Sequence, residues 1–124
     1  MKTVENVKIY RDKYAALPER FVQKIESDLN CILKKKIPGL KKVYLFGSCA
    51  RGKVRSTSDI DLLIVTDKKM QDRTLAADIR WTLDEPRDGV RTDVVYRNEE
   101  TCGESSVFDR ELERDKKLIL EVEE

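Results

Sequence analysis

The chain of 124 residues has the usual length of one domain, and with 40% charged and only 6% aromatic residues it is typical of a globular protein with a well-hydrated surface. A formal net charge of +1 gives no overall basic field, so we expect no direct binding to nucleic acid. Histidine is absent, which excludes Ser-His-Asp and Cys-His catalysis and the common histidine-containing zinc sites.

The cysteines and the first residues bear on cellular location. Cys31, Cys49 and Cys102 are odd in number and lack a C-x-x-C spacing, which favours free thiols over a disulfide framework or a zinc site. Free thiols fit a reducing cytoplasm. Residues 1–10 are too polar for a signal peptide, and no apolar run approaches membrane-spanning length. We therefore expect one cytoplasmic domain over residues 1–124 with no membrane contact.

The first predicted element is an amphipathic helix that begins after Pro18, a residue suited to the first helical turn. Lysines at 34–36 would lie at its C-terminus, where the helix dipole favours cations, and Pro38-Gly39 would end it. Its apolar residues fall on one face: Phe21, Val22, Ile25, Leu29, Ile32 and Leu33.

Strands and helices are then expected to alternate. Residues 43–46 and 59–65 are short apolar segments typical of buried strands, separated by a sharp turn at Gly47-Ser48. A helix is expected at about 68–83, with apolar residues at spacing four, and a third strand at 90–96.

The last elements are less strongly marked. Ser106 with Asp109 resembles a capping box, so a final helix would begin there, and residues 118–120 form either a short edge strand or the end of that helix. This order of elements predicts an α/β fold, a small mixed sheet with helices packed mainly on one face.

Charge is unevenly distributed along the chain. Residues 31–58 contain eight Lys or Arg and no Asp or Glu, whereas residues 98–124 contain ten acidic and four basic residues. The basic part favours an anionic ligand near the first half, but on charge alone ordinary solvated faces are the better interpretation.

The most informative segment contains Asp59 and Asp61. Alternate residues of a strand point to the same face, so these carboxylates would project side by side, roughly 7 Å apart at their backbones. Between apolar neighbours such a pair is costly unless a cation lies between them, and Mg²⁺ prefers carboxylate oxygens completed by water and substrate phosphates.

A third carboxylate, Asp93, lies in a similar apolar strand. If the two strands are neighbours, Asp93 joins Asp59 and Asp61 on one face. Three converging carboxylates can hold two metal ions about 4 Å apart and activate an attacking hydroxyl.

Gly47 and Ser48 follow a strand and precede a short helical turn. Glycine lets the backbone approach a phosphate closely, and the following amides and the Ser48 hydroxyl can donate to phosphate oxygens. Arg51, Lys53 and Arg55 in the same loop can offset the charge of a triphosphate.

Each signal has a purely structural interpretation on its own. An isolated D-x-D is usually a solvated pair, Gly-Ser is usually a turn, and Asp93 can pair with Arg91 or Arg97. The combination favours a site. Residues 47–53 also begin a Walker A loop, but Val54 replaces its required Ser or Thr. The Asp59 region lacks the glycine and the terminal glutamate of an EF-hand.

Gly47-Ser48, ten residues, then Asp59-x-Asp61 resembles the signature of the polymerase-β-like nucleotidyltransferase superfamily. The local sequences Phe46-Gly47-Ser48-Cys49-Ala50-Arg51-Gly52 and Ser58-Asp59-Ile60-Asp61-Leu62 are similar to its minimal (MNT) branch, and Asp93 matches that branch's third acid. The resemblance covers residues 43–96 well.

The resemblance implies a polymerase-β palm-like fold and a role for each matching residue. Asp59 and Asp61 would bind two Mg²⁺ ions, and Asp93 would bind one of them and help to deprotonate the acceptor hydroxyl. Gly47 and Ser48 would hold the triphosphate of ATP, and we expect Arg51 and Ser58 to contact the nucleotide as well. In such a reaction catalysis is mostly positioning and charge neutralisation, so a site without histidine is adequate.

The resemblance also implies a protein acceptor, because larger relatives carry an acceptor-binding domain for which this chain has no room. MNT proteins are typically paired with HEPN ribonuclease toxins and act as antitoxins that attach AMP to a toxin tyrosine. Two alternatives stay open at this point: an antitoxin that acts by binding alone, and nucleotidylation of a small molecule such as an aminoglycoside.

Overall fold

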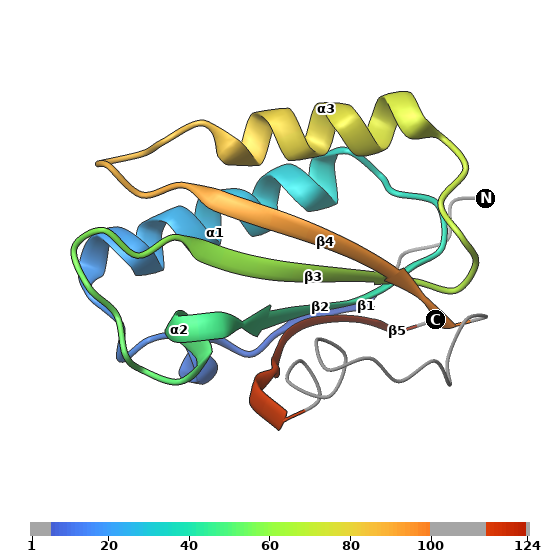
Figure 1. The fold of residues 1–124 in the computed structure, drawn as a ribbon. Helices are drawn as coiled ribbons and strands as arrows, with labels where there is room; N and C mark the ends of the chain where they lie inside the picture. Colours follow the sequence, from blue (N-terminus) through green and yellow to red (C-terminus); the bar gives the residue numbers. More distant parts are fainter. Residues whose placement is uncertain (1–5, 100–113, 124) are drawn as a thin grey trace.

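A computed structural model describes residues 6–99 and 114–123 (Figure 1). In chain order its elements are β1 (Asn6–Ile9), a 3-10 helix η1 (Arg11–Lys13), α1 (Glu19–Lys34), β2 (Leu40–Phe46), α2 (Gly47–Ala50), β3 (Ile60–Thr66), α3 (Arg73–Asp84), β4 (Thr92–Asn98) and β5 (Lys117–Glu123). The strands form one sheet in the order β1-β5-β2-β3-β4. Only the β3–β4 pair among these is parallel.

Helices α1 and α3 lie side by side on one face of this sheet (Figure 1). The mixed α/β fold with helices mainly on one face is therefore confirmed. Within the described residues, no helix is both long enough and apolar enough to cross a membrane.

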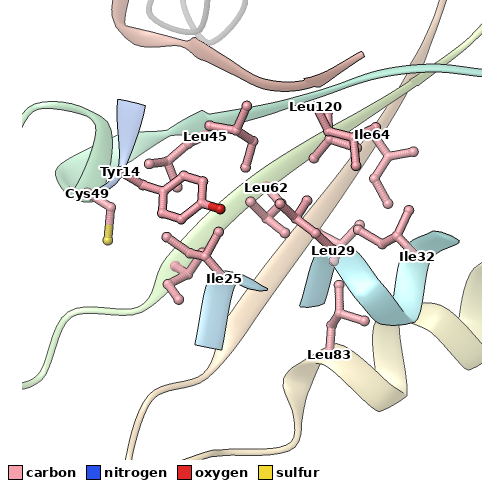
Figure 2. Close-up of a cluster of buried hydrophobic side chains, with 14 of the residues drawn as sticks. Tyr14, Ile25, Leu29, Ile32, Leu45, Cys49, Leu62, Ile64, Leu83 and Leu120 are labelled. Atoms are coloured by element: carbon pink, nitrogen blue, oxygen red, sulfur yellow. The ribbon is translucent and has the colours of Figure 1, made fainter. Parts of the chain in front are cut away.

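The main core fills the space between the two helices and the sheet (Figure 2). Leu29 and Ile32 of α1 pack toward Leu62 and Ile64 of β3, and Leu83 closes the core from α3. Full burial of each such side chain stabilises the fold by about 1.5–3 kcal/mol. Burial of Leu62 and Ile64 against the helices therefore determines which face of β3 points to the core.

The amphipathic face expected for α1 is confirmed, since five of its six predicted residues are buried and Leu33 is half-buried. The start expected for α3 near residue 68 is wrong. Asp72 caps this helix by accepting a hydrogen bond from the Leu75 amide at 2.9 Å, so the helix begins at Arg73. An Asp cap satisfies an amide that the first helical turn leaves without a partner.

The end of the chain corrects a second expectation. Strand β5 is neither an edge strand nor a helix end, because it pairs with β1 on one side and β2 on the other. Sequence reasoning did not predict β1 at all. The helix expected to start at Ser106 lies outside the described residues.

The sheet face opposite the helices carries a second, smaller apolar cluster. Phe46 and Leu63 are buried there, with Tyr44, Val65 and Val95 packed against them. Strands β3 and β4 both begin at the end of the sheet where α2 lies (Figure 1). This face and this end hold the predicted site.

Candidate active site

Asp61 and Asp93 are directly paired across two parallel strands, as the register of β3 and β4 shows. Residues that are paired in this way project to the same face of a sheet. Their neighbours Ile60 and Thr92 are also paired with each other, and both are buried on the helix side. The two carboxylates therefore share the opposite face, and the expectation that their strands are neighbours is confirmed.

Asp59 precedes β3 by one residue and is exposed. The predicted strand start at residue 59 is therefore one residue too early, although the Ile60 amide still bonds the Arg91 carbonyl at 2.9 Å. With Ile60 fully buried between them, Asp59 and Asp61 flank the same inward-pointing residue. Asp59 is close enough to raise the pKa of Asp61 by charge repulsion.

Gly47 and Ser48 are the first two residues of the short helix α2, whereas the sequence analysis placed that helical turn directly after them. Gly47 adopts φ +72°, a conformation that favours glycine. The β2–β3 register pairs Phe46 with Asp61, so the turn that follows Phe46 comes up against the Asp61 side chain. The predicted phosphate turn and the predicted metal ligands are therefore adjacent in space.

The electrostatics of the site are dominated by Asp61. Burial, then repulsion from Asp93 and Asp59, raises its pKa to about 6, and the nearby Arg51 partly offsets this. Burial, then repulsion from Asp61 and Asp59, raises the pKa of the Cys49 thiol to about 11. That thiol is protonated at neutral pH and donates to the Asp59 carbonyl at 3.5 Å.

Arg51 is half-exposed and pairs with Asp115 at 2.9 Å, next to the start of β5. Sequence reasoning missed Asp115, which is 64 positions away in the chain. Ser58 accepts a hydrogen bond from the Arg55 amide at 2.8 Å and so closes a turn of the loop before β3. A contact of Arg51 or Ser58 with a nucleotide stays a prediction.

The carboxylates fit a divalent cation by their chemistry. Within residues 6–99 and 114–123, no group of three acidic or sulfur side chains has the geometry of a preformed metal site. Mg²⁺ does not need one, because it is commonly held by one or two carboxylates and by the phosphates of its substrate. The paired Asp61 and Asp93 supply two, and repulsion from Asp93 and Asp59 adds to the burial that raises the pKa of Asp61.

Residues 26–121 match the model of a protein family described as the nucleotidyltransferase domain. The chain belongs to the nucleotidyltransferase domain family. The superfamily that the Gly47-Ser48 and Asp59-x-Asp61 motif indicated is thereby confirmed, and the chain is a nucleotidyltransferase. No curated protein matches its sequence.

Solved structures similar to this nucleotidyltransferase include three from toxin–antitoxin complexes. A mutant of MntA–HpeT has 22% identity and a TM-score of 0.53, with 75% of this chain and 70% of that chain covered. A toxin–antitoxin with AMP-PNP has 25% identity and a TM-score of 0.49, with coverages of 75% and 70%. The structure of a tri-AMPylated Shewanella oneidensis HEPN toxin in complex with MNT antitoxin has 23% identity and a TM-score of 0.45, with 75% of this chain and 69% of that chain covered. The MntA–HpeT match shows a shared fold.

Sequence reasoning also missed a set of polar residues behind the site. Lys24 and Asp28 are buried on α1, and Thr92 is buried at the start of β4. A signal was present, because Lys24 and Asp28 are four apart on a helix and are each followed by a buried apolar residue, Ile25 and Leu29. Their contact with Thr92 had no local signal.

Proposed function

We propose that this nucleotidyltransferase moves AMP from ATP to a hydroxyl group of a partner protein, and that the partner is a HEPN-type toxin modified on a tyrosine. The observation that carries the reaction type is the pairing of Asp61 with Asp93 beside the Gly47-Ser48 turn. Family membership supports nucleotidyl transfer in general.

The choice of partner rests on similarity to proteins that work in pairs. The motif resembles the MNT branch, and one similar fold comes from the MntA–HpeT toxin–antitoxin complex. The described part of the chain also offers little enclosure for a small second substrate, because Asp59 and Asp93 are exposed. A protein acceptor would supply its own half of the site.

In the proposed reaction, the acceptor oxygen forms a bond to the α-phosphorus, the bond from that phosphorus to the pyrophosphate breaks, and pyrophosphate leaves. Asp93 is exposed beside Asp61 and accepts the proton of the acceptor hydroxyl. Gly47 lets the triphosphate approach the backbone, and Ser48 and Arg51 bind its oxygens.

Asp59, Asp61 and Asp93 would hold up to two Mg²⁺ ions. When bound, these ions supply charge neutralisation at the triphosphate and acidify the acceptor hydroxyl. The carboxylates of this chain would orient the nucleotide through these ions, because a cation between a carboxylate and a phosphate is attracted to both.

The decisive experiment uses the chain co-expressed with its partner and ATP labelled at either the α- or the γ-phosphate. We expect label from the α-phosphate alone to reach the partner, together with a mass increase of one AMP per modified tyrosine. Transfer of the γ-label would contradict nucleotidyl transfer. If the label is found on a partner residue other than tyrosine, nucleotidyl transfer is supported and the choice of tyrosine as acceptor is wrong.

Asp61→Asn separates catalysis from simple binding. We expect this variant to bind the partner but to leave it unmodified and toxic. If the variant protects cells from the toxin as well as the native chain does, the protein acts by binding and the enzymatic account of protection is wrong.

A further inference from the structure

Behind the candidate site lies a buried polar cluster that connects three elements. Lys24, Asp28 and Thr92 are 2%, 3% and 1% exposed, and within the described residues only Thr66 joins them as a buried polar residue. Lys24 and Asp28 belong to α1, and Thr92 is the first residue of β4. Buried charges are costly unless they are paired and hydrogen-bonded.

In this cluster every donor of the lysine is used. The Lys24 ammonium donates to Asp28 Oδ1 at 2.5 Å, to the Leu83 carbonyl at 2.8 Å and to Thr92 Oγ1 at 2.8 Å. The Thr92 hydroxyl donates in turn to Asp28 Oδ2. The Leu83 carbonyl lies in the last turn of α3, where it has no partner within the helix. The cluster thus joins α1, the end of α3 and the start of β4 in a closed network.

Stability alone gives a poor reason for such a network. An apolar set of similar volume is often as stable as a buried ion pair, because the pair must first be removed from water. What the network adds is position, since each hydrogen bond has a preferred length and direction. It sets where β4 begins relative to α1.

The position of Thr92 determines that of Asp93. The two are adjacent in β4, with Thr92 directed to the helices and Asp93 to the open face. Thr92 is paired with Ile60, and Asp93 is paired with Asp61. A shift of Thr92 along the strand would therefore move the Asp93 carboxylate away from Asp61.

Arg20 extends the same face of α1 by one turn, four residues before Lys24. Its guanidinium donates to the Ser56 carbonyl at 3.0 Å and to the Asp88 carbonyl at 3.1 Å. Ser56 belongs to the loop that leads to Asp59, and Asp88 belongs to the turn that leads to Thr92. Arg20 therefore holds together the loop that precedes Asp59 and the turn that precedes Asp93.

We propose that Arg20, Lys24 and Asp28 form a positioning stripe on α1, at spacing four, which holds the segments that carry Asp59 and Asp93 in register for cation and nucleotide binding. None of the three touches the substrate. They act through Thr92 and through the backbone of the two flanking segments. This inference rests on the proposed function, because it assigns the stripe to the carboxylates of that reaction.

The test compares Thr92→Val with Thr92→Ser in the full chain. Valine keeps the shape and removes the hydroxyl, whereas serine keeps the hydroxyl. Binding of the Mn²⁺ complex of a non-hydrolysable ATP analogue, measured by electron paramagnetic resonance without acceptor, serves as the main readout, with thermal unfolding recorded in parallel. Loss of a supporting contact typically weakens metal affinity by about 10–100-fold, so we expect at least tenfold weaker binding for valine and near-native binding for serine.

Arg20→Met is the second variant, because Arg20 is at the surface and its loss leaves no buried charge without a partner. Lys35→Met is the matched control: Lys35 follows the last residue of α1 and forms an ion pair with Asp78 of α3, which lies in neither segment that carries an acid. We expect weaker Mn²⁺ binding for Arg20→Met and unchanged binding for Lys35→Met.

The outcomes separate the two proposals. If the native chain does not bind the Mn²⁺ complex of the ATP analogue, the proposed function fails. If the native chain binds it and both Thr92→Val and Arg20→Met bind it equally well, the function stands and the positioning stripe is refuted. A lower unfolding temperature with unchanged affinity in the folded protein would also refute it, since that is the pattern of a merely structural role.

Discussion

The Asp61 carboxylate occupies the space that a side chain would need at Gly47. A Cβ placed on Gly47 would overlap Oδ2 of Asp61 and stand 3.1 Å from its Cγ. Glycine is therefore required at position 47 for two reasons: its φ is +72°, and a side chain there would overlap the Asp61 carboxylate. The ten-residue gap before Asp59 brings these two parts of the motif together through the antiparallel β2–β3 pair.

Gly47→Ala is expected to destabilise the chain and to weaken nucleotide binding. Placing alanine at this φ costs roughly 1–2 kcal/mol, and the overlap with Asp61 adds to that cost. Gly52→Ala is the matched control, because Gly52 also has φ +72° but has no atom within 4 Å of its added Cβ. Thermal unfolding and calorimetric titration with a non-hydrolysable ATP analogue measure the two effects.

The difference between these two alanine variants isolates the carboxylate contact. We expect the Gly52 variant to lose stability by strain alone and to keep its affinity. Equal losses of stability and equal affinities in the two variants would show that the Asp61 contact is unimportant.

The local parts of the site were accessible to sequence reasoning because they depend on short-range geometry. Strand alternation is enough to place Asp59 and Asp61 on either side of the buried Ile60. Helical spacing is enough to identify the buried face of α1. Asp93 needed one further assumption, that β3 and β4 are neighbours, and a strand, helix, strand order makes parallel neighbours common.

Contacts between distant segments were not accessible in this way. Strand β5 looked like an edge strand or a helix end because its three most apolar residues carry no information on what pairs with them. Its position between β1 and β2 depends on pairings between distant residues, such as Ile9 with Leu120 and Val43 with Leu120. The Arg51–Asp115 pair depends on that same placement.

Asp93→Asn is expected to lower the rate of transfer much more than it changes the KM for ATP. A general base contributes typically about 10²–10⁴-fold to a rate, and asparagine cannot accept the proton. Asp88→Asn is the control, since Asp88 is exposed in the turn before β4 and only its backbone carbonyl is used by the fold. Steady-state kinetics with a verified acceptor decide, and a native rate for Asp93→Asn would remove Asp93 from the reaction.

The metal-free chain is expected to lose stability as the pH rises from about 4 to 6. The pKa of Asp61 is about 6 in the folded chain against 3.8 for an ordinary aspartate carboxyl, so the native state binds the proton more tightly than the unfolded state. The stabilisation that proton binding gives the folded chain is complete below pH 3.8 and is lost as the pH rises through about 6. Asp61 is partly open to solvent, which reduces the effect to about 1 kcal/mol.

The comparison of Asp61→Asn with the native chain measures this effect by thermal unfolding in a chelator. We expect equal unfolding temperatures near pH 4 and a variant that is more stable by roughly 4 °C above pH 7. Saturating Mg²⁺ should reverse the order, because only the native chain gains from binding it. A variant less stable than the native chain at pH 7 without metal would contradict the repulsion between Asp61 and its neighbours.

Arg51 is expected to exchange Asp115 for the triphosphate when the nucleotide binds. Asp115 is the more buried partner, and its hydrogen bond from Arg51 holds its pKa below the usual value. A charge-assisted hydrogen bond contributes about 1.5–3 kcal/mol, so Arg51→Ala should weaken binding of the ATP analogue by about tenfold or more.

Asp115→Asn frees the Arg51 guanidinium and should instead tighten binding of the ATP analogue by about threefold at low salt, an effect that added salt screens. Both changes should leave the free energy of unfolding nearly unchanged, because Arg51 is half-exposed and an ion pair with an exposed partner contributes little to stability. The double variant distinguishes exchange from independent effects: with Arg51 already removed, Asp115→Asn should no longer change the affinity. If Asp115→Asn alone weakens binding as much as Arg51→Ala does, Asp115 orients Arg51 toward the nucleotide and does not compete with it.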